Sequence, residues 1–151
     1  MTQEEKDLLL RDLCARLPYG VKCCIYNFGE DIVRIKEDIL WSVQGDNILT
    51  LKSCVEKGEA YMYHQIRPYL FPLSSMTEEQ KKELNKKFNV QLLGNDIYSI
   101  HYHSEGCWDT DLELDFQDWL WFINWCYKNH FDVNKLIEKG LAIDAIELNI
   151  Y

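Results

Sequence analysis

Two histidines and one cysteine form the closest group of potential metal ligands in the sequence. His101 and His103 are two positions apart, so both imidazoles would lie on the same face of a β-strand. Cys107 could return toward them through the turn at Gly106 and act as a third zinc ligand. The fourth ligand would be water or one of three side chains: His64, Glu105 or Asp109.

The alternative interpretation is that both histidines lie on the solvated face of a strand whose opposite face is apolar. We favour it, because incomplete ligand sets are common by chance, and we expect no bound cofactor.

Catalytic motifs are not evident in the sequence. It contains no G-x-S-x-G elbow, P-loop, H-E-x-x-H pair or glycine-rich dinucleotide fingerprint. The acidic run 109–115 does not fit an EF-hand, since Leu114 and Leu120 occupy the positions that require glycine and glutamate. We therefore expect a protein without enzymatic activity, although a Cys–His pair assembled in space would leave no sequence motif.

The cysteines form no C-x-x-C pair and match no common zinc framework. We interpret them as reduced thiols that serve as small core residues: Cys14, Cys23, Cys24, Cys54, Cys107 and Cys126.

An acidic and aromatic segment between Lys87 and Lys128 is the strongest asymmetry in the chain. It contains no lysine or arginine, four of the five tryptophans and seven acidic residues. In a helix, Trp119 and Trp121 point in nearly opposite directions, so Trp121 either packs against another part of the protein or is exposed.

An exposed tryptophan beside carboxylates is typical of an interface for a basic or aromatic partner. Because the segment has no cation of its own, we expect its charges to be complemented by another protein or by a second copy. The predicted partner-binding residues are Trp108, Asp111, Glu113, Asp115, Asp118 and Trp121.

Composition narrows the class of protein. The 151 residues include 25 acidic and 16 basic side chains, which give a net charge of −9, and 47% of the residues are hydrophobic. Such an acidic protein is poorly suited to general nucleic-acid binding, which depends largely on lysine and arginine. No apolar run approaches the ~20 residues that span a bilayer, and the acidic N-terminus differs from a secretory signal. We therefore expect a cytoplasmic protein that does not bind membranes.

The first half of the sequence predicts a helix followed by a small β-barrel. Thr2 and Glu5 form a capping box, and Pro18 and Gly20 end the helix. Its polar face, expected to be solvated, contains Glu4, Lys6, Arg11 and Asp12. The hydrophobic pattern then changes to a period of two, which predicts five short strands in an SH3-like barrel at 21–26, 33–36, 39–44, 49–52 and 60–64. The proline-containing segment 66–73 is predicted to be a packed, extended connector.

The second half predicts helices and one hairpin. Thr77 and Gln80 form a second capping box for a helix over 77–88, and the turn 94–96 joins strands at 90–93 and 97–103. A helix from Phe116 to about 129 is expected to bury a broad stripe with Phe122 beside it: Trp119, Leu120, Ile123, Cys126 and Tyr127. A short helix over 132–137 and a docked apolar tail follow.

Together these elements predict an α+β fold with an N-terminal helix, a five-stranded SH3-like barrel or meander, and a helical lobe with a β-hairpin. We expect residues 1–73 to form the first part and residues 74–151 an α+β lobe packed on it, or both to belong to one continuous domain.

Three blocks of sequence carry a resemblance to a known family: TQEEKDLLLRDLCARLPYGVK, IRPYLFPLSSMTEEQKKEL and NHFDVNKLIEKGLAIDA. They resemble a family of small uncharacterised proteins from gut Bacteroidales and their prophages, in which the last block usually continues through a proline-containing tail that this chain lacks. The resemblance implies a prophage or mobile-element setting and an accessory or regulatory role. It supplies no catalytic residues.

The favoured function is therefore non-catalytic binding of a partner through the acidic and aromatic segment. One alternative is a metal-binding protein or enzyme that uses His101, His103 and Cys107. The other is nucleic-acid binding through the small barrel, whose expected outer face contains Lys22, Arg34, Lys36 and Lys52.

Overall fold

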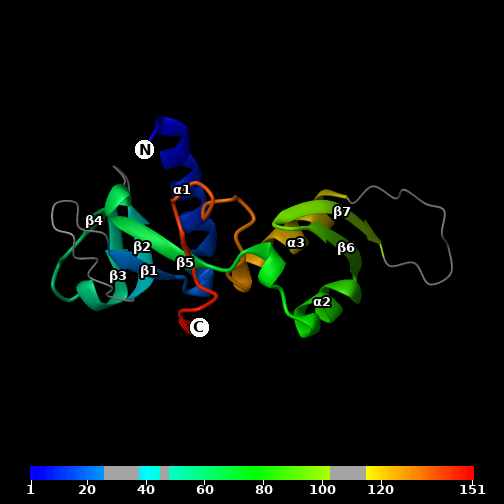
Figure 1. The fold of residues 1–151 in the computed structure, drawn as a ribbon. Coiled ribbons are helices and arrows are strands. Elements are labelled where there is room, and N and C mark those ends of the chain that lie inside the picture. The colour runs from blue at the N-terminus through cyan, green and yellow to red at the C-terminus, as the bar shows by residue number, and fades with distance from the viewer. Residues whose placement is uncertain (26–37, 45–47, 103–114) are drawn as a thin grey trace.

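The protein has a mixed α/β fold in which an N-terminal helix, a sheet and a later helix are joined by one chain. The computed structural model describes residues 1–25, 38–44, 48–102 and 115–151. The sheet and the first helix lie on one side of the molecule, and a hairpin with two further helices lies on the other (Figure 1).

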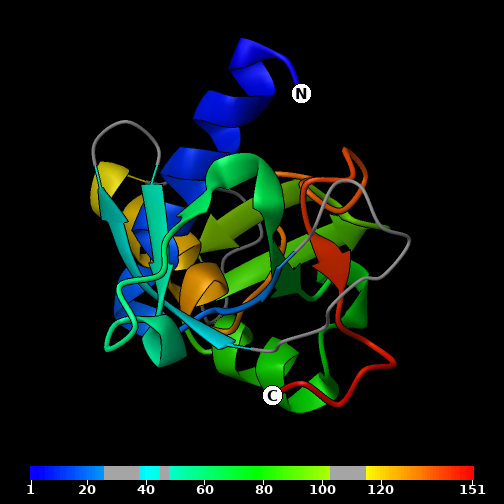
Figure 2. The same ribbon diagram turned by 90° about the vertical axis from the view of Figure 1, so that its left-hand side faces the viewer.

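The helix α1, Gln3–Arg16, begins at the predicted capping box. The backbone N–H of Glu5 donates to the Thr2 hydroxyl at 3.2 Å, and the backbone N–H of Thr2 donates to the Glu5 carboxylate at 2.7 Å. A short 3₁₀ turn, Leu17–Tyr19, follows, and Gly20 leaves it at a φ of 64°, a left-handed conformation that suits glycine. In the turned view the N-terminal turns of α1 extend past the sheet (Figure 2).

Six strands form the main sheet in the order β4-β3-β2-β1-β5-β8. Their bounds are β1 Lys22–Ile25, β2 Asp38–Gln44, β3 Ile48–Leu51, β4 Tyr61–Met62, β5 Ile66–Leu70 and β8 Ile143–Asp144. All neighbours are antiparallel except β5 and β8, which are parallel. The described strands form an open sheet with β4 and β8 at its edges, so the predicted closed barrel is not found among them. The predicted strand at 33–36 lies outside the described residues.

The segment predicted as a connector is instead a strand inside the sheet. In β5, Ile66 pairs with Ile25, and Pro68 pairs with Cys23. On its other side β5 meets β8 only from Tyr69 onward. Proline has no N–H to donate, and Pro68 therefore occupies a position with a neighbouring described strand on one side only. The prolines excluded a helix and favoured an extended path, as found, but the strand β5 that contains Pro68 also pairs with residues more than 70 positions later in the chain.

The hairpin and its helices follow the predicted order. The helix α2, Glu78–Asn85, starts at the Thr77 capping box and is shorter than predicted, because Phe88 already belongs to strand β6, Phe88–Leu93. Strand β7, Asp96–Tyr102, pairs with β6 around Gly94, whose φ is 62°. The helix α3, Phe116–Lys128, is capped by Asp115.

No helix forms over 132–137, contrary to the prediction. The Asp132 carboxylate accepts hydrogen bonds from the backbone N–H groups of Leu136 and Ile137, both at 2.8 Å. Lys135 has a φ of 56°, which a right-handed helix does not allow. The turns that result lead into the tail, which docks as predicted by burying Leu141, Ala142, Ala145 and Ile150.

Two main groups of buried side chains hold the fold together. One lies between α1 and the sheet, where Leu9 and Leu13 pack against sheet residues such as Leu40. The other lies among the hairpin, α2 and α3, and includes Phe88 and Phe122. The two-part division at residue 73 stays a prediction, although β8 connects the C-terminal tail with the first sheet.

A buried ion pair on α1 joins the two sides of the molecule. Asp12, expected on the solvated face, is fully buried beside Arg16, whose Nε donates to the Asp12 carboxylate at 2.6 Å. The guanidinium also donates to the carbonyl of Phe131 at 2.8 Å and lies 4.8 Å from the centre of the Tyr127 ring. Asn134 donates to the same Asp12 carboxylate at 2.9 Å. This face of α1 is therefore covered by α3 and the residues that follow it.

Candidate partner-binding surface

Of the predicted site residues, the structure describes the side chains of Asp115, Asp118 and Trp121. Trp108, Asp111 and Glu113 lie outside the described residues, as do the candidate metal ligands His103 and Cys107. The backbone of His101 is in β7 and pairs with Asn89 of β6. Among the side chains that are described, no group of three or more His, Cys, Asp or Glu residues is arranged to hold a metal ion.

Asp115 positions the start of α3. Its carboxylate accepts a hydrogen bond from the backbone N–H of Asp118 at 2.9 Å, the usual arrangement of an N-cap. The residue itself is exposed. Its negative charge is further stabilised at the positive end of the helix dipole, which places one acidic group firmly at the beginning of α3.

Asp118 and Trp121 both contact Lys87, which lies just before β6. The Lys87 ammonium is 3.0 Å from the Asp118 carboxylate and 4.9 Å from the centre of the Trp121 ring. Trp121 is also in edge-to-face contact with Phe88, with ring centres 5.5 Å apart. Asp118 is buried and Trp121 is half-buried, so both hold α3 against the hairpin.

Cations from outside the acidic segment thus complement part of its charge. Besides Lys87 and Asp118, Lys135 forms an ion pair with Asp96, and Asp96 raises the pKa of Lys135 through a hydrogen bond and charge attraction. The expectation that these acids must find their complement on a partner is therefore wrong for Asp96 and Asp118. It rested on the lack of lysine and arginine within the segment, whereas the complementary cations come from either side of it.

The exposed apolar residues of α3 are Phe116, Trp119 and Leu120. Their side chains are 75%, 42% and 42% exposed, respectively. With spacings of three and four residues they lie on one side of the helix, and together with Asp115 we call them the outer α3 face. Trp119 was predicted to be buried, but its ring instead makes an edge contact with Phe122, with centres 6.3 Å apart.

The stripe that α3 buries is rotated from the predicted one. It contains Asp118, Phe122, Trp125 and Cys126. Trp125 stacks on Phe131 with ring centres 5.8 Å apart, and the Asp118–Lys87 pair fixes the same side of the helix. The sequence contains apolar residues around most of the circumference of α3, so periodicity alone could not select the buried side. The spacing of 116, 119 and 120 was visible in the sequence, but Trp119 and Leu120 were assigned to the buried stripe.

The buried cysteines are poor candidates for nucleophiles. Burial raises the pKa of the thiols of Cys23, Cys24 and Cys126, in the last case to about 12. These thiols therefore stay protonated at neutral pH, whereas the thiolate is the reactive form. Cys54 is also buried, as predicted, while Cys14 is exposed, contrary to the prediction.

Of the basic residues predicted on the outer face of the barrel, Lys22 is engaged within the protein. The Lys22 ammonium donates to the carbonyl of Ile150 and lies 5.5 Å from the centre of the Tyr151 ring. Lys22 therefore holds the C-terminal tail in place. Lys52 is exposed, and Arg34 and Lys36 lie outside the described residues.

Comparison of the chain with protein-family models, with curated proteins and with solved structures gives no match. None of the helices in the described part of the chain has the length and apolar character needed to cross a membrane.

Proposed function

We propose that the protein is a non-catalytic interaction protein that binds another protein through the outer α3 face. The observation that carries this proposal is the exposure of Phe116, Trp119 and Leu120 on one side of a helix that is capped by an exposed carboxylate. Large apolar side chains grouped at a surface are typical of interaction sites, and tryptophan is the residue type most enriched among energetic anchors.

The proposed partner presents an apolar patch beside basic side chains. The net charge of −9 and the acidic residues that precede α3 in the sequence favour a partner of opposite charge. A protein of this kind would act as an accessory factor, and the resemblance to prophage-associated proteins suggests that setting. The proposal replaces Trp121 with Trp119 as the anchor, because Trp121 packs against Phe88 within the protein.

The test is affinity capture of cellular proteins by three immobilised forms of the full chain: the wild type, Trp119→Glu and Leu93→Glu. Leu93 is the matched control, because it is an exposed leucine at the end of β6 and does not belong to the outer α3 face. We expect a protein that is retained by the wild type and by Leu93→Glu but lost with Trp119→Glu. For an anchor tryptophan the affinity should fall by about 30-fold or more, and capture should weaken as salt is added.

Sedimentation of the purified chain completes the test. A partner captured equally by all three forms would contradict the proposal, as would a failure of the wild type to retain any protein that Trp119→Glu loses. A dimer of the wild type that is abolished by Trp119→Glu would assign the outer α3 face to self-association, and the proposed basic partner would then be wrong.

A further inference from the structure

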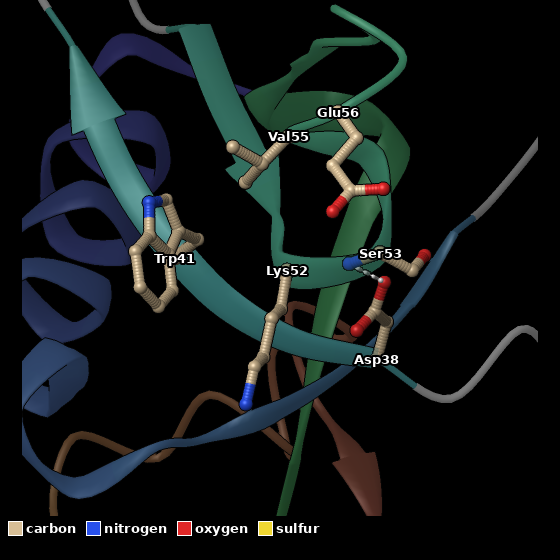
Figure 3. Close-up of a pocket in the computed structure, with 6 residues that line it drawn as sticks. All are labelled: Asp38, Trp41, Lys52, Ser53, Val55 and Glu56. Atoms are coloured by element: carbon tan, nitrogen blue, oxygen red, sulfur yellow. Dashed lines mark hydrogen bonds between the residues drawn. The ribbon is translucent and has the colours of Figure 1, made fainter.

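A second candidate site lies on the sheet, away from α3, where an exposed tryptophan borders a pocket. The pocket has a volume of about 510 Å³ and is lined by Asp38, Trp41, Lys52, Ser53, Val55 and Glu56 (Figure 3). Trp41 is on β2, and the other residues are at the start of β2 and in the turns after β3. The side chain of Trp41 is 57% exposed, which is unusual for the largest apolar residue type.

Hydrogen bonds from backbone N–H groups to the Asp38 carboxylate hold one side of this pocket in place. One oxygen of the Asp38 carboxylate accepts from the N–H of Ile39 at 2.8 Å, and the other accepts from the N–H of Ser53 at 2.9 Å. These bonds tie the first residue of β2 to the 3₁₀ turn Lys52–Cys54. Cys54, the next residue, is fully buried and anchors the turn in the core. The side chains that border the pocket therefore extend from a backbone that is held by hydrogen bonds and by the buried Cys54.

The charged groups are arranged unevenly around the indole. In Figure 3 the Trp41 ring and the Glu56 carboxylate lie on opposite sides of Val55, whereas the Lys52 side chain extends away from Glu56. Among the described residues that line the pocket, Glu56 and Lys52 carry opposite charges and extend in different directions, and the protein as a whole is strongly acidic. An aromatic face and a carboxylate each attract a cation, and the pocket presents both.

We propose that this pocket binds an arginine side chain presented by a basic peptide or protein segment. The aliphatic part of the arginine would lie against Val55 and the indole of Trp41, and its guanidinium would stack on the indole and pair with Glu56. Arginine suits this geometry better than lysine, because its planar guanidinium stacks on aromatic rings and is more weakly hydrated. Lys52 opposes the ligand and limits its affinity.

The experiment uses the full chain and a short glycine-arginine-glycine peptide blocked at both ends, so that the guanidinium is its only charge. Binding is followed by NMR through the indole N–H signal of Trp41, which is assigned by its loss in Trp41→Phe. The matched probe is the same peptide with citrulline, which has the shape of arginine without its charge. We expect the arginine peptide to shift the Trp41 signal and the citrulline peptide to shift it far less.

Charge variants distinguish a cationic ligand from other ligands. Glu56→Gln should weaken binding of the arginine peptide and Lys52→Gln should strengthen it, each by about two- to fivefold, as expected for single charges at a partly exposed site. Trp41→Ala should weaken it by about fivefold or more. The controls are Glu59→Gln and Lys57→Gln, which remove exposed charges near the pocket but outside its lining and should change the affinity less.

Several results would overturn the proposal. Equal binding of the citrulline peptide would show that charge is not recognised. Weaker binding of the arginine peptide to Lys52→Gln would contradict the predicted repulsion between the Lys52 ammonium and the guanidinium. The absence of any Trp41 shift at millimolar arginine peptide would exclude the site. This proposal is independent of the outer α3 face, since Trp119→Glu should leave the titration unchanged.

Discussion

Replacement of Asp12 should destabilise the protein far more than replacement of any exposed acid. In Asp12→Ala the Arg16 guanidinium stays fully buried and charged, because arginine does not lose its proton in proteins. It would keep the hydrogen bond to the Phe131 carbonyl and the contact with Tyr127, but no anion. We expect the free energy of unfolding to fall by about 3–5 kcal/mol, the typical cost of leaving one partner of a buried pair alone.

The magnitude follows from two opposing terms. Two unit charges about 4 Å apart attract by about 4 kcal/mol at an effective dielectric constant of about 20. Removing each ion from water costs several kcal/mol, so the intact pair contributes little net stability compared with apolar residues of similar size. Arg16 also leaves Nη1 buried without a partner among the described residues, which adds to its cost.

The double variant Asp12→Leu/Arg16→Met should therefore lie within about 2 kcal/mol of the wild type, or exceed it in stability. The assay is urea unfolding of the wild type, Asp12→Ala, Asp12→Leu, Arg16→Met and the double variant, followed by far-UV circular dichroism. The control is Glu78→Gln, which breaks the exposed Glu78–Lys81 pair and should give no resolvable change. Single losses below about 1 kcal/mol that add up in the double variant would refute the reasoning, since the two groups would then not be coupled.

Three further predictions concern single groups. Burial lowers the pKa of His130 to about 4, so its contribution to stability is complete above pH 6.5 and is lost as the pH falls from 6.5 to 4. Unfolding measurements over this pH range should detect a loss of about 1 kcal/mol, and the loss should be absent in His130→Asn. In thiol labelling of the folded protein, Cys14 should react quickly and Cys126 only on unfolding, and equal rates measured by mass spectrometry would contradict the assigned burial. Thr2→Ala should cost about 1 kcal/mol of unfolding free energy through loss of the α1 cap, and Thr2→Ser, which keeps the hydroxyl, should cost much less.

Features encoded over a few residues were predicted correctly from the sequence. The capping boxes at Thr2 and Thr77 fixed the starts of α1 and α2, and the turn at Gly94 fixed the hairpin. Each depends on hydrogen bonds or backbone angles within three or four positions. The same local reasoning explains why α3 was found with nearly correct bounds.

Features that depend on distant residues were not predictable in this way. The pair of Asp12 and Arg16 has the spacing of an ordinary surface pair, and it is buried because Phe131 and Asn134 cover it from the other end of the chain. Strand β5 contains Pro68 and was interpreted as a connector, and only its pairing with β1 and β8 makes it a strand. In both cases the local conformation was identified, but the burial of the ion pair and the pairing of the strand are set by long-range packing.

The candidate binding site combines both kinds of information. The sequence identified the helix 116–128 as the most aromatic segment, but it could not say which tryptophan faces outward. A helix with apolar residues on most sides needs more than one apolar contact. The fold covers one side of α3, the side that contains Phe122, Trp125 and Cys126. Lys87 then fixes the rotation of the helix by pairing with Asp118 and covering Trp121. With that rotation set, Trp119 is the exposed tryptophan of this helix, which is why it is the proposed anchor.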